Sequence, residues 1–179
     1  NDEGIYDAMN KSIQFLAPGI VNYLNAGDVY SDYRTLSRVV DSFGDKTVFL
    51  WGDIARFDGD EICRAVSQRR GLVSFGKIHQ ICHQSAFFLV DKSKLVHDIN
   101  LSICSDFLVL VRYWFSSGDK TYLATPLVKY LNGGISDTNQ LLLIDEKIAV
   151  ICHHWPKPIE RVLNVAYLKI LKIQKLVTS

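Results

Sequence analysis

The sequence predicts an α/β domain built on a mixed sheet flanked by helices. Helix-type and strand-type segments alternate along the first 51 residues, which is the pattern of that class. The chain has 179 residues, 48% of them hydrophobic and 22% charged, which is enough to build one core. Its net charge of +1 gives no overall field that would attract a polyanion, so we expect no nucleic-acid partner.

The N-terminal elements follow from apolar spacing and from turn residues. Apolar side chains at helical spacing after Gly4 predict a helix that Pro18-Gly19 ends. A second helix is expected to begin at Ser31 as its N-cap and to stop at Gly44. The expected elements, in order, are a helix over 5–16, a buried strand over 20–24, a polar loop over 25–28, a helix over 31–43 and a strand over 46–51.

The middle of the chain shows no clear helical period, and we interpret residues 53–89 as loops and mixed strands that cover one side of the sheet. Strand-like pieces occur in it at 72–75 and 86–90. The later expected elements are a helix over 105–115, a strand over 121–130, a turn over 132–136 and a helix over 159–177.

The last of these helices is amphipathic and basic, and we separate it (156–179) from a main domain over 1–155. Arg161, Lys169, Lys172 and Lys175 project from one arc, and nearly all other positions are apolar. Two interpretations fit equally well: a helix that lies on an anionic membrane surface, and a terminal helix packed on the domain. No apolar run is long enough to cross a bilayer, so we expect a cytoplasmic protein that can lie on the inner face of the membrane.

The four cysteines lack a CxxC pair, which favours reduced thiols in a cytosolic protein. The alternative is a zinc site, although neither cluster has the spacing of a known zinc module. Its ligands would come from His79, Cys82 and His83 together with Cys152, His153 and His154.

Asp28 is the residue whose placement best suits metal chemistry. It directly follows a predicted strand, and Gly27 beside it allows a sharp turn and close approach of a phosphate. A divalent cation that bridges a carboxylate and a diphosphate suits this position. A simple polar turn explains Asn25-Ala26-Gly27-Asp28 as well.

Taken together, several stretches resemble the family 2 glycosyltransferases of the GT-A fold, especially those that build bacterial exopolysaccharides such as colanic acid. The similarity begins with Asp2-Glu3-Gly4-Ile5-Tyr6-Asp7-Ala8-Met9-Asn10-Lys11 and continues over 18–28. It extends through Cys82-His83-Gln84-Ser85, through Ser105-Asp106-Phe107 ahead of Arg112, and to Gly133-Gly134-Ile135-Ser136. These motifs stand in the family's order and rough spacing.

The resemblance implies a transferase that moves a sugar from a nucleotide-diphosphate donor to a lipid-linked or polysaccharide acceptor, with inversion. Asp28 would hold Mg²⁺ or Mn²⁺ against the diphosphate, and Asp106 would be the general base. On the sequence alone, Asp106 also suits a helix N-terminus. The substrate-binding positions implied by the resemblance are Asp7, Asn10, Lys11, His83, Gln84, Gly133, Gly134 and Ser136.

The sequence departs from the family in three respects. Asn25 stands at the first position of the metal motif, and Leu108 stands where many relatives carry a second acid. Nothing in the sequence corresponds to the family's N-terminal β-α-β portion, so we expect the later two-thirds of such an enzyme. The alternative is a non-catalytic remnant or binding subunit that keeps the fold without donor binding.

Overall fold

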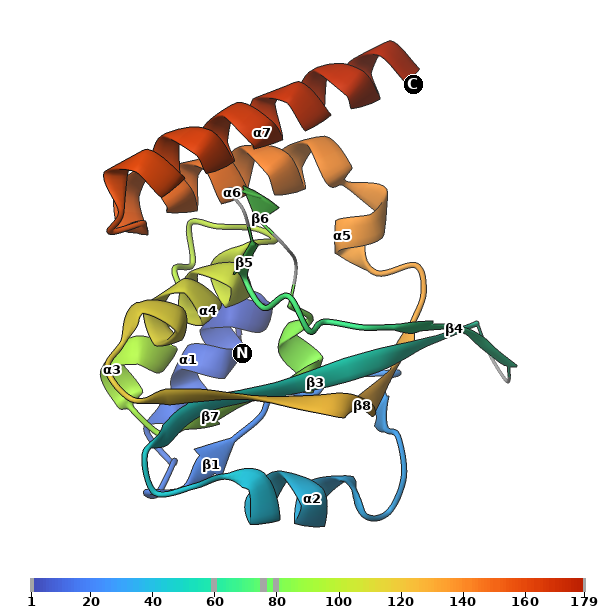
Figure 1. Ribbon diagram of the computed structural model, residues 1–179, viewed down its shortest axis with the longest axis vertical. Helices are drawn as coiled ribbons and strands as arrows, with labels where there is room; N and C mark the ends of the chain where they lie inside the picture. Colours follow the sequence, from blue (N-terminus) through green and yellow to red (C-terminus); the bar gives the residue numbers. More distant parts are fainter. Residues whose placement is uncertain (1, 59–60, 75–76, 79–80, 179) are drawn as a thin grey trace.

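The computed structural model describes residues 2–58, 61–74, 77–78 and 81–178 (Figure 1). Its elements, in chain order, are α1 (Ile5–Ile13), β1 (Ile20–Val21), β2 (Val29–Tyr30), α2 (Thr35–Ser42), β3 (Thr47–Asp58), β4 (Glu61–Val66), β5 (Val73–Ser74), β6 (Lys77–Ile78), a 3₁₀ turn (His83–Ser85), β7 (Ala86–Leu89), α3 (Lys92–Leu95), α4 (Ser105–Phe115), β8 (Asp119–Leu131), α5 (Ile135–Thr138), α6 (Gln140–His154) and α7 (Pro158–Thr178). The α/β class and the mixed sheet flanked by helices are confirmed.

The main sheet has the strand order β1-β7-β3-β8-β2. The long strands β3 and β8 are parallel, and the other pairs of this sheet are antiparallel. β4 pairs with the distal half of β3, from Ile54 to Asp58, where β7 no longer accompanies it. β3 therefore has different neighbours in its first and second halves. The candidate site lies on the sheet face beside β4 and the 3₁₀ turn.

The two faces of the sheet bury different cores. On one face, Val39 of α2 packs with a small apolar cluster made of Leu50, Phe87, Leu127 and Val128. On the other face, Phe49, Trp51 and Phe88 pack with side chains of α1, α4, α6 and α7. Figure 1 shows α2 alone below the sheet and the other long helices stacked above it, with α7 outermost.

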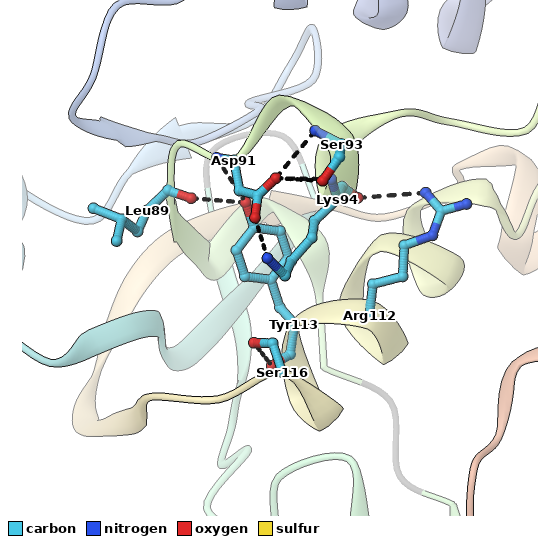
Figure 2. Close-up of polar contacts among 7 residues, drawn as sticks. All are labelled: Leu89, Asp91, Ser93, Lys94, Arg112, Tyr113 and Ser116. Carbon is cyan, nitrogen blue, oxygen red and sulfur yellow. Dashed lines mark hydrogen bonds and ion pairs between the residues drawn. The ribbon is translucent and has the colours of Figure 1, made fainter.

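A polar cluster ties α4 to the end of β7 (Figure 2). The Tyr113 hydroxyl donates to the carbonyl of Leu89 at 2.7 Å, and Arg112 donates to the carbonyl of Lys94. Asp91 caps α3 by accepting hydrogen bonds from the amides of Ser93 and Lys94. Arg112, which follows the Ser105-Asp106-Phe107 motif, is therefore engaged with backbone carbonyls.

The helices over 105–115 and 159–177 are confirmed closely, whereas the second helix begins later than predicted. Ser31 is not its N-cap: the Ser31 amide donates to the carbonyl of Leu127, which continues the pairing of β2 with β8. α2 begins at Thr35, and its apolar residues Leu36 and Val40 are exposed. The strand over 20–24 is reduced to Ile20–Val21.

α6 was not predicted, although it supplies much of the interface that buries α7. Ile144, Val150 and Ile151 of α6 belong to the main core, together with Leu168 of α7. The predicted terminal helix therefore packs on the domain along one of its sides. No helix in the described ranges has the length and apolar content needed to span a bilayer.

Candidate functional site

A cavity of about 750 Å³ lies between the sheet and the helices α1, α4 and α6. Its volume suits a small-molecule ligand. Five residues to which the resemblance assigns a role line it: His83, Gln84, Asp106, Gly134 and Ser136. Asn25 and Ala26 of the polar loop line it as well. Segments separated by about a hundred positions in the sequence thus meet around one space.

The central contact of the cavity joins His83 and Asp106. Nδ1 of His83 lies 2.6 Å from Oδ2 of Asp106, and the other carboxylate oxygen accepts the Phe107 amide at 2.7 Å. Burial acts to raise the pKa of the Asp106 carboxyl, but the charge and hydrogen bond of His83, with the Phe107 amide and the charge of Lys147, together lower this pKa. Nε2 of His83 is buried and has no hydrogen-bond partner within the described part of the chain. The pair therefore combines an orienting carboxylate with a buried ring nitrogen that is unengaged within the described residues.

The turn that carries His83 is fixed by a buried glutamine. The side-chain amide of Gln68 donates to the carbonyl of Gly52 at 2.6 Å and to Oγ of Ser85 at 2.8 Å. Its oxygen accepts the amide of Cys82. Because Gln68 contacts both β3 and the turn, it sets the height of His83 above the sheet.

Gln84 is the other half of the His83-Gln84 motif, and it is buried. Its Oε1 accepts a hydrogen bond from the thiol of Cys82 at 2.7 Å. Burial raises the pKa of that thiol to about 12, so Cys82 remains a protonated donor. The carbonyl of Gln84 accepts the side-chain amide of Asn22 at 2.8 Å, which anchors the turn to the segment after β1.

The position of Asp106 depends on the loop before α4, which a carboxylate of α6 holds. Glu146 is buried, and it accepts the amides of Ser102 at 2.7 Å and of Ile103 and Cys104 at 2.9 Å. Three amide donors around one carboxylate satisfy a buried charge well. The position of the N-terminus of α4, and thus of Asp106, is set by this contact.

A tyrosine from α1 completes this end of the cavity. Tyr6 lines the cavity together with Asp106. Burial raises the pKa of the Tyr6 hydroxyl, and the charge of Asp106 acts in the same direction, so Tyr6 remains a neutral phenol.

Cations outnumber acids at the cavity. Arg56 of β3, Arg64 of β4 and Lys147 of α6 line it, and among the described lining residues Asp106 is the single acid. The Arg56 guanidinium lies 5.4 Å from the ring centre of Tyr130, and the Lys147 ammonium lies 5.6 Å from that of Phe107. Burial lowers the pKa of Lys147, although nearby Cys104 and Asp106 counteract it. This balance of charge suits an anionic ligand.

Asp28 lies beside the cavity without lining it. It is buried, and its Oδ1 accepts the amide of Leu131 at 2.8 Å. Gly27 has a φ of +94°, and a Cβ at this position would lie 2.9 Å from a side-chain carbon of Leu131, so glycine suits this close approach. These contacts dock the polar loop on the end of β8.

The predicted substrate contacts of α1 do not line the cavity. Asp7 and Lys11 form an i,i+4 ion pair at 2.6 Å on an exposed part of the helix. Asn10 clamps the backbone of His97, donating to its carbonyl at 2.8 Å and accepting its amide at 2.7 Å. The cavity-facing residues of α1 are instead Ile5, Tyr6 and Met9.

Gly133 does not line the cavity either. It has a φ of +92°, which favours glycine and makes the turn that precedes α5. Gly134 does line it, and a Cβ there would lie 3.1 Å from the Tyr130 hydroxyl. The first glycine therefore serves the turn, and the second leaves room beside Tyr130.

The zinc alternative finds no support among the described residues. No group of three or more His, Cys, Asp or Glu side chains in the described ranges could hold a metal ion. Cys82 is engaged with Gln84, whereas Cys152, His153 and His154 are exposed at the end of α6. His79 lies outside the described residues.

Sequence reasoning missed Tyr6, Arg56, Arg64, Glu146 and Lys147. One of them carried a usable signal: Tyr6 follows Ile5 and precedes Met9 on the apolar face of α1. Glu146 stands between two other charged residues, Asp145 and Lys147, so its sequence context does not distinguish it. The arginines carried no such signal, because alternate strand residues face opposite sides and the partner layers were unknown.

The chain matches no protein-family model, and no curated protein sequence is significantly similar to it.

Proposed function

We propose that this chain is a glycosyltransferase that moves a sugar from a nucleotide-diphosphate donor to a hydroxyl of a lipid-linked or polysaccharide acceptor. The observation that carries the proposal is the convergence of the motif residues on one cavity. His83, Asp106 and Gly134 come from three separate motifs, and all line the same space. Five of the ten residues to which the resemblance assigns a role line this cavity, and their convergence supports the proposal.

The charge of the cavity supports a diphosphate donor. Arg56, Arg64 and Lys147 can neutralise the negative charge that grows on the leaving diphosphate as the sugar–oxygen bond breaks. Arginine suits this task because its planar fork binds phosphate oxygens in pairs.

The His83–Asp106 pair supports deprotonation of the acceptor. As the acceptor oxygen attacks the anomeric carbon, its proton passes to the pair, and the bond between that carbon and the diphosphate oxygen breaks. Both oxygens of Asp106 are already engaged, whereas Nε2 of His83 is not. In this arrangement His83 accepts the proton, and Asp106 stabilises the imidazolium that forms.

The proposal includes Mg²⁺ or Mn²⁺, which Asp28 would hold. One carboxylate with substrate phosphates and water is a common way to bind Mg²⁺, and Asp28 offers one carboxylate oxygen besides the one bonded to Leu131. Asp28 itself does not line the cavity, so this assignment requires a diphosphate that extends to the polar loop, whose Asn25 and Ala26 do line it. When bound, the cation would supply further neutralisation of the leaving group.

The proposal is tested on the intact protein with the Asp106→Asn variant. We expect donor binding to persist and turnover to fall by roughly 10² to 10⁴, the usual contribution of a general base or its partner. A loss of donor affinity without this fall in turnover would make Asp106 a binding residue. The rival, a non-catalytic binding subunit, predicts acceptor binding with no turnover from any nucleotide sugar in the unmodified protein.

A further inference from the structure

α7 has a second apolar side that nothing in the described structure covers. Leu168 packs in the core that α6 shares, and Asn164 is buried too, as expected for the packed side of the helix. On the other side, seven large aliphatic side chains are between 51% and 80% exposed: Ile159, Val162, Leu163, Ile170, Ile173, Leu176 and Val177. We refer to these seven residues as the outer stripe.

The outer stripe extends along the whole helix. Its members occur in two groups, at 159–163 and at 170–177, and the 3.6-residue helical period places both groups on the same side of the helix. Figure 1 places α7 at the outer edge of the molecule, beyond α6 as seen from the sheet. A flat surface could therefore contact the stripe over its full length.

The basic residues do not lie where the sequence pattern alone suggested. Lys172 pairs with Asp145 of α6 at 2.6 Å, and Arg161 donates to the carbonyl of Cys152. Lys175 donates to the side chain of Gln140. Lys169 remains exposed at the edge of the outer stripe. The basic arc thus flanks the stripe on the α6 side.

The charge of α7 indicates what kind of surface fits the outer stripe. The helix has four cations and one acid, Glu160, and so carries +3, whereas the whole chain carries +1. The other residues together are therefore slightly negative, at −2. A helix is about 10–12 Å wide, so even the cations beside α6 lie within roughly one Debye length of whatever the stripe contacts.

We propose that the outer stripe of α7 lies on an anionic lipid bilayer. The aliphatic side chains enter the boundary between head groups and acyl chains, and Lys169 lies at the level of the head groups. An anionic surface attracts the positive end of the chain and repels the rest, which orients α7 toward the membrane. A second copy of the chain is disfavoured, because it would bring two +3 helices together, and the stripe is broader than a coiled-coil seam.

This proposal does not depend on the proposed transferase activity, and vesicle binding tests it without any substrate. The intact protein is sedimented with vesicles of phosphatidylglycerol and phosphatidylcholine, and with vesicles of phosphatidylcholine alone, at ~0.1 M and ~1 M salt. The stripe variant is Ile170→Gln with Ile173→Gln. The matched control is Leu36→Gln with Val40→Gln, which removes two exposed aliphatic side chains from α2, below the sheet (Figure 1).

We expect the unmodified protein and the α2 control to bind the anionic vesicles, with weaker binding at high salt. The stripe variant should bind at least tenfold more weakly and keep its melting temperature, because both side chains are exposed. The proposal is overturned if the unmodified protein does not bind anionic vesicles at low salt, or if the stripe variant binds as well as the control. A dimer in sedimentation velocity that only the stripe variant loses would instead assign the stripe to a second copy.

Discussion

Nδ1 of His83 and Oδ2 of Asp106 lie 2.6 Å apart at the wall of one cavity, although 23 positions separate the two residues in the sequence. Gln68 holds the turn that carries His83, and Glu146 holds the loop that precedes Asp106. The pair is thus assembled from two sides by buried side chains.

If His83 and Asp106 act as a unit, their substitutions should not be additive. His83→Gln and Asp106→Asn should each lower kcat by roughly 10² to 10⁴, and the double variant should be little worse than either. Rates with saturating donor and acceptor measure this. Asp145→Asn, which removes an exposed carboxylate on α6, serves as the control. Fully additive losses would mean that the two residues act separately.

Glu146→Gln should destabilise the fold through the loop before α4. The variant keeps one acceptor oxygen but leaves amides of 102–104 poorly satisfied, which should cost about 1–3 kcal/mol of the free energy of unfolding. Urea unfolding measures this cost. The neighbouring Asp145→Asn breaks an exposed ion pair and should cost less than about 1 kcal/mol. Equal losses of unfolding free energy in the two variants would show that Glu146 does not stabilise the loop before α4 more than an exposed ion pair does.

His97 should make stability depend on pH. Burial lowers its pKa from 6.5 to about 4, and its ring stacks on that of Tyr6 at 5.4 Å. Between these two pH values, the unfolded chain binds a proton that the folded chain does not. Stability should therefore fall as the pH decreases from 6.5 to about 4, by up to about 3 kcal/mol.

The His97→Phe variant isolates this effect. Phenylalanine can keep the stacking, and the clamp of Asn10 on the backbone at this position does not involve the side chain. Unfolding free energies should then be flatter with pH in the variant, whereas His153→Gln on an exposed site should behave as the unmodified protein does. Parallel pH profiles for His97→Phe and the unmodified protein would show that another group is responsible.

Asp28→Asn should abolish transfer and leave the fold nearly unchanged. The amide oxygen can still accept the Leu131 amide, so the loop stays docked, while the charge needed for a divalent cation is lost. Thermal unfolding and turnover with saturating Mn²⁺ separate the two effects. Near-normal turnover would end the assignment of Asp28 to the metal.

The elements with the strongest local signals were predicted well. The helices over 105–115 and 159–177 have long apolar runs, and the structure places them at Ser105–Phe115 and Pro158–Thr178. Ser31 was misassigned because a serine before an apolar run is also compatible with the end of a short strand, and pairing with Leu127 decides the matter. α6 gave a weak periodic signal, because apolar residues occur around most of its circumference.

The candidate site, like the fold, was predicted only in part. Motif matching selected His83 and Asp106, which meet, and Asp7 and Lys11, which pair with each other away from the cavity. A helix presents several faces, and only tertiary packing decides which of them borders a cavity. The role of Glu146 depends on contacts across more than 40 positions, and a single sequence contains no local signal for such a contact.

The most direct test of the central claim is a titration of the intact protein with a panel of nucleotide-diphosphate sugars in the presence of Mg²⁺ or Mn²⁺. The shift in melting temperature and the release of nucleotide diphosphate are followed for the unmodified protein and for Asp106→Asn. We predict that at least one donor stabilises both proteins and is turned over by the unmodified protein alone. Failure of every donor to bind, or equal turnover by the two proteins, would contradict the assignment of the cavity to sugar transfer.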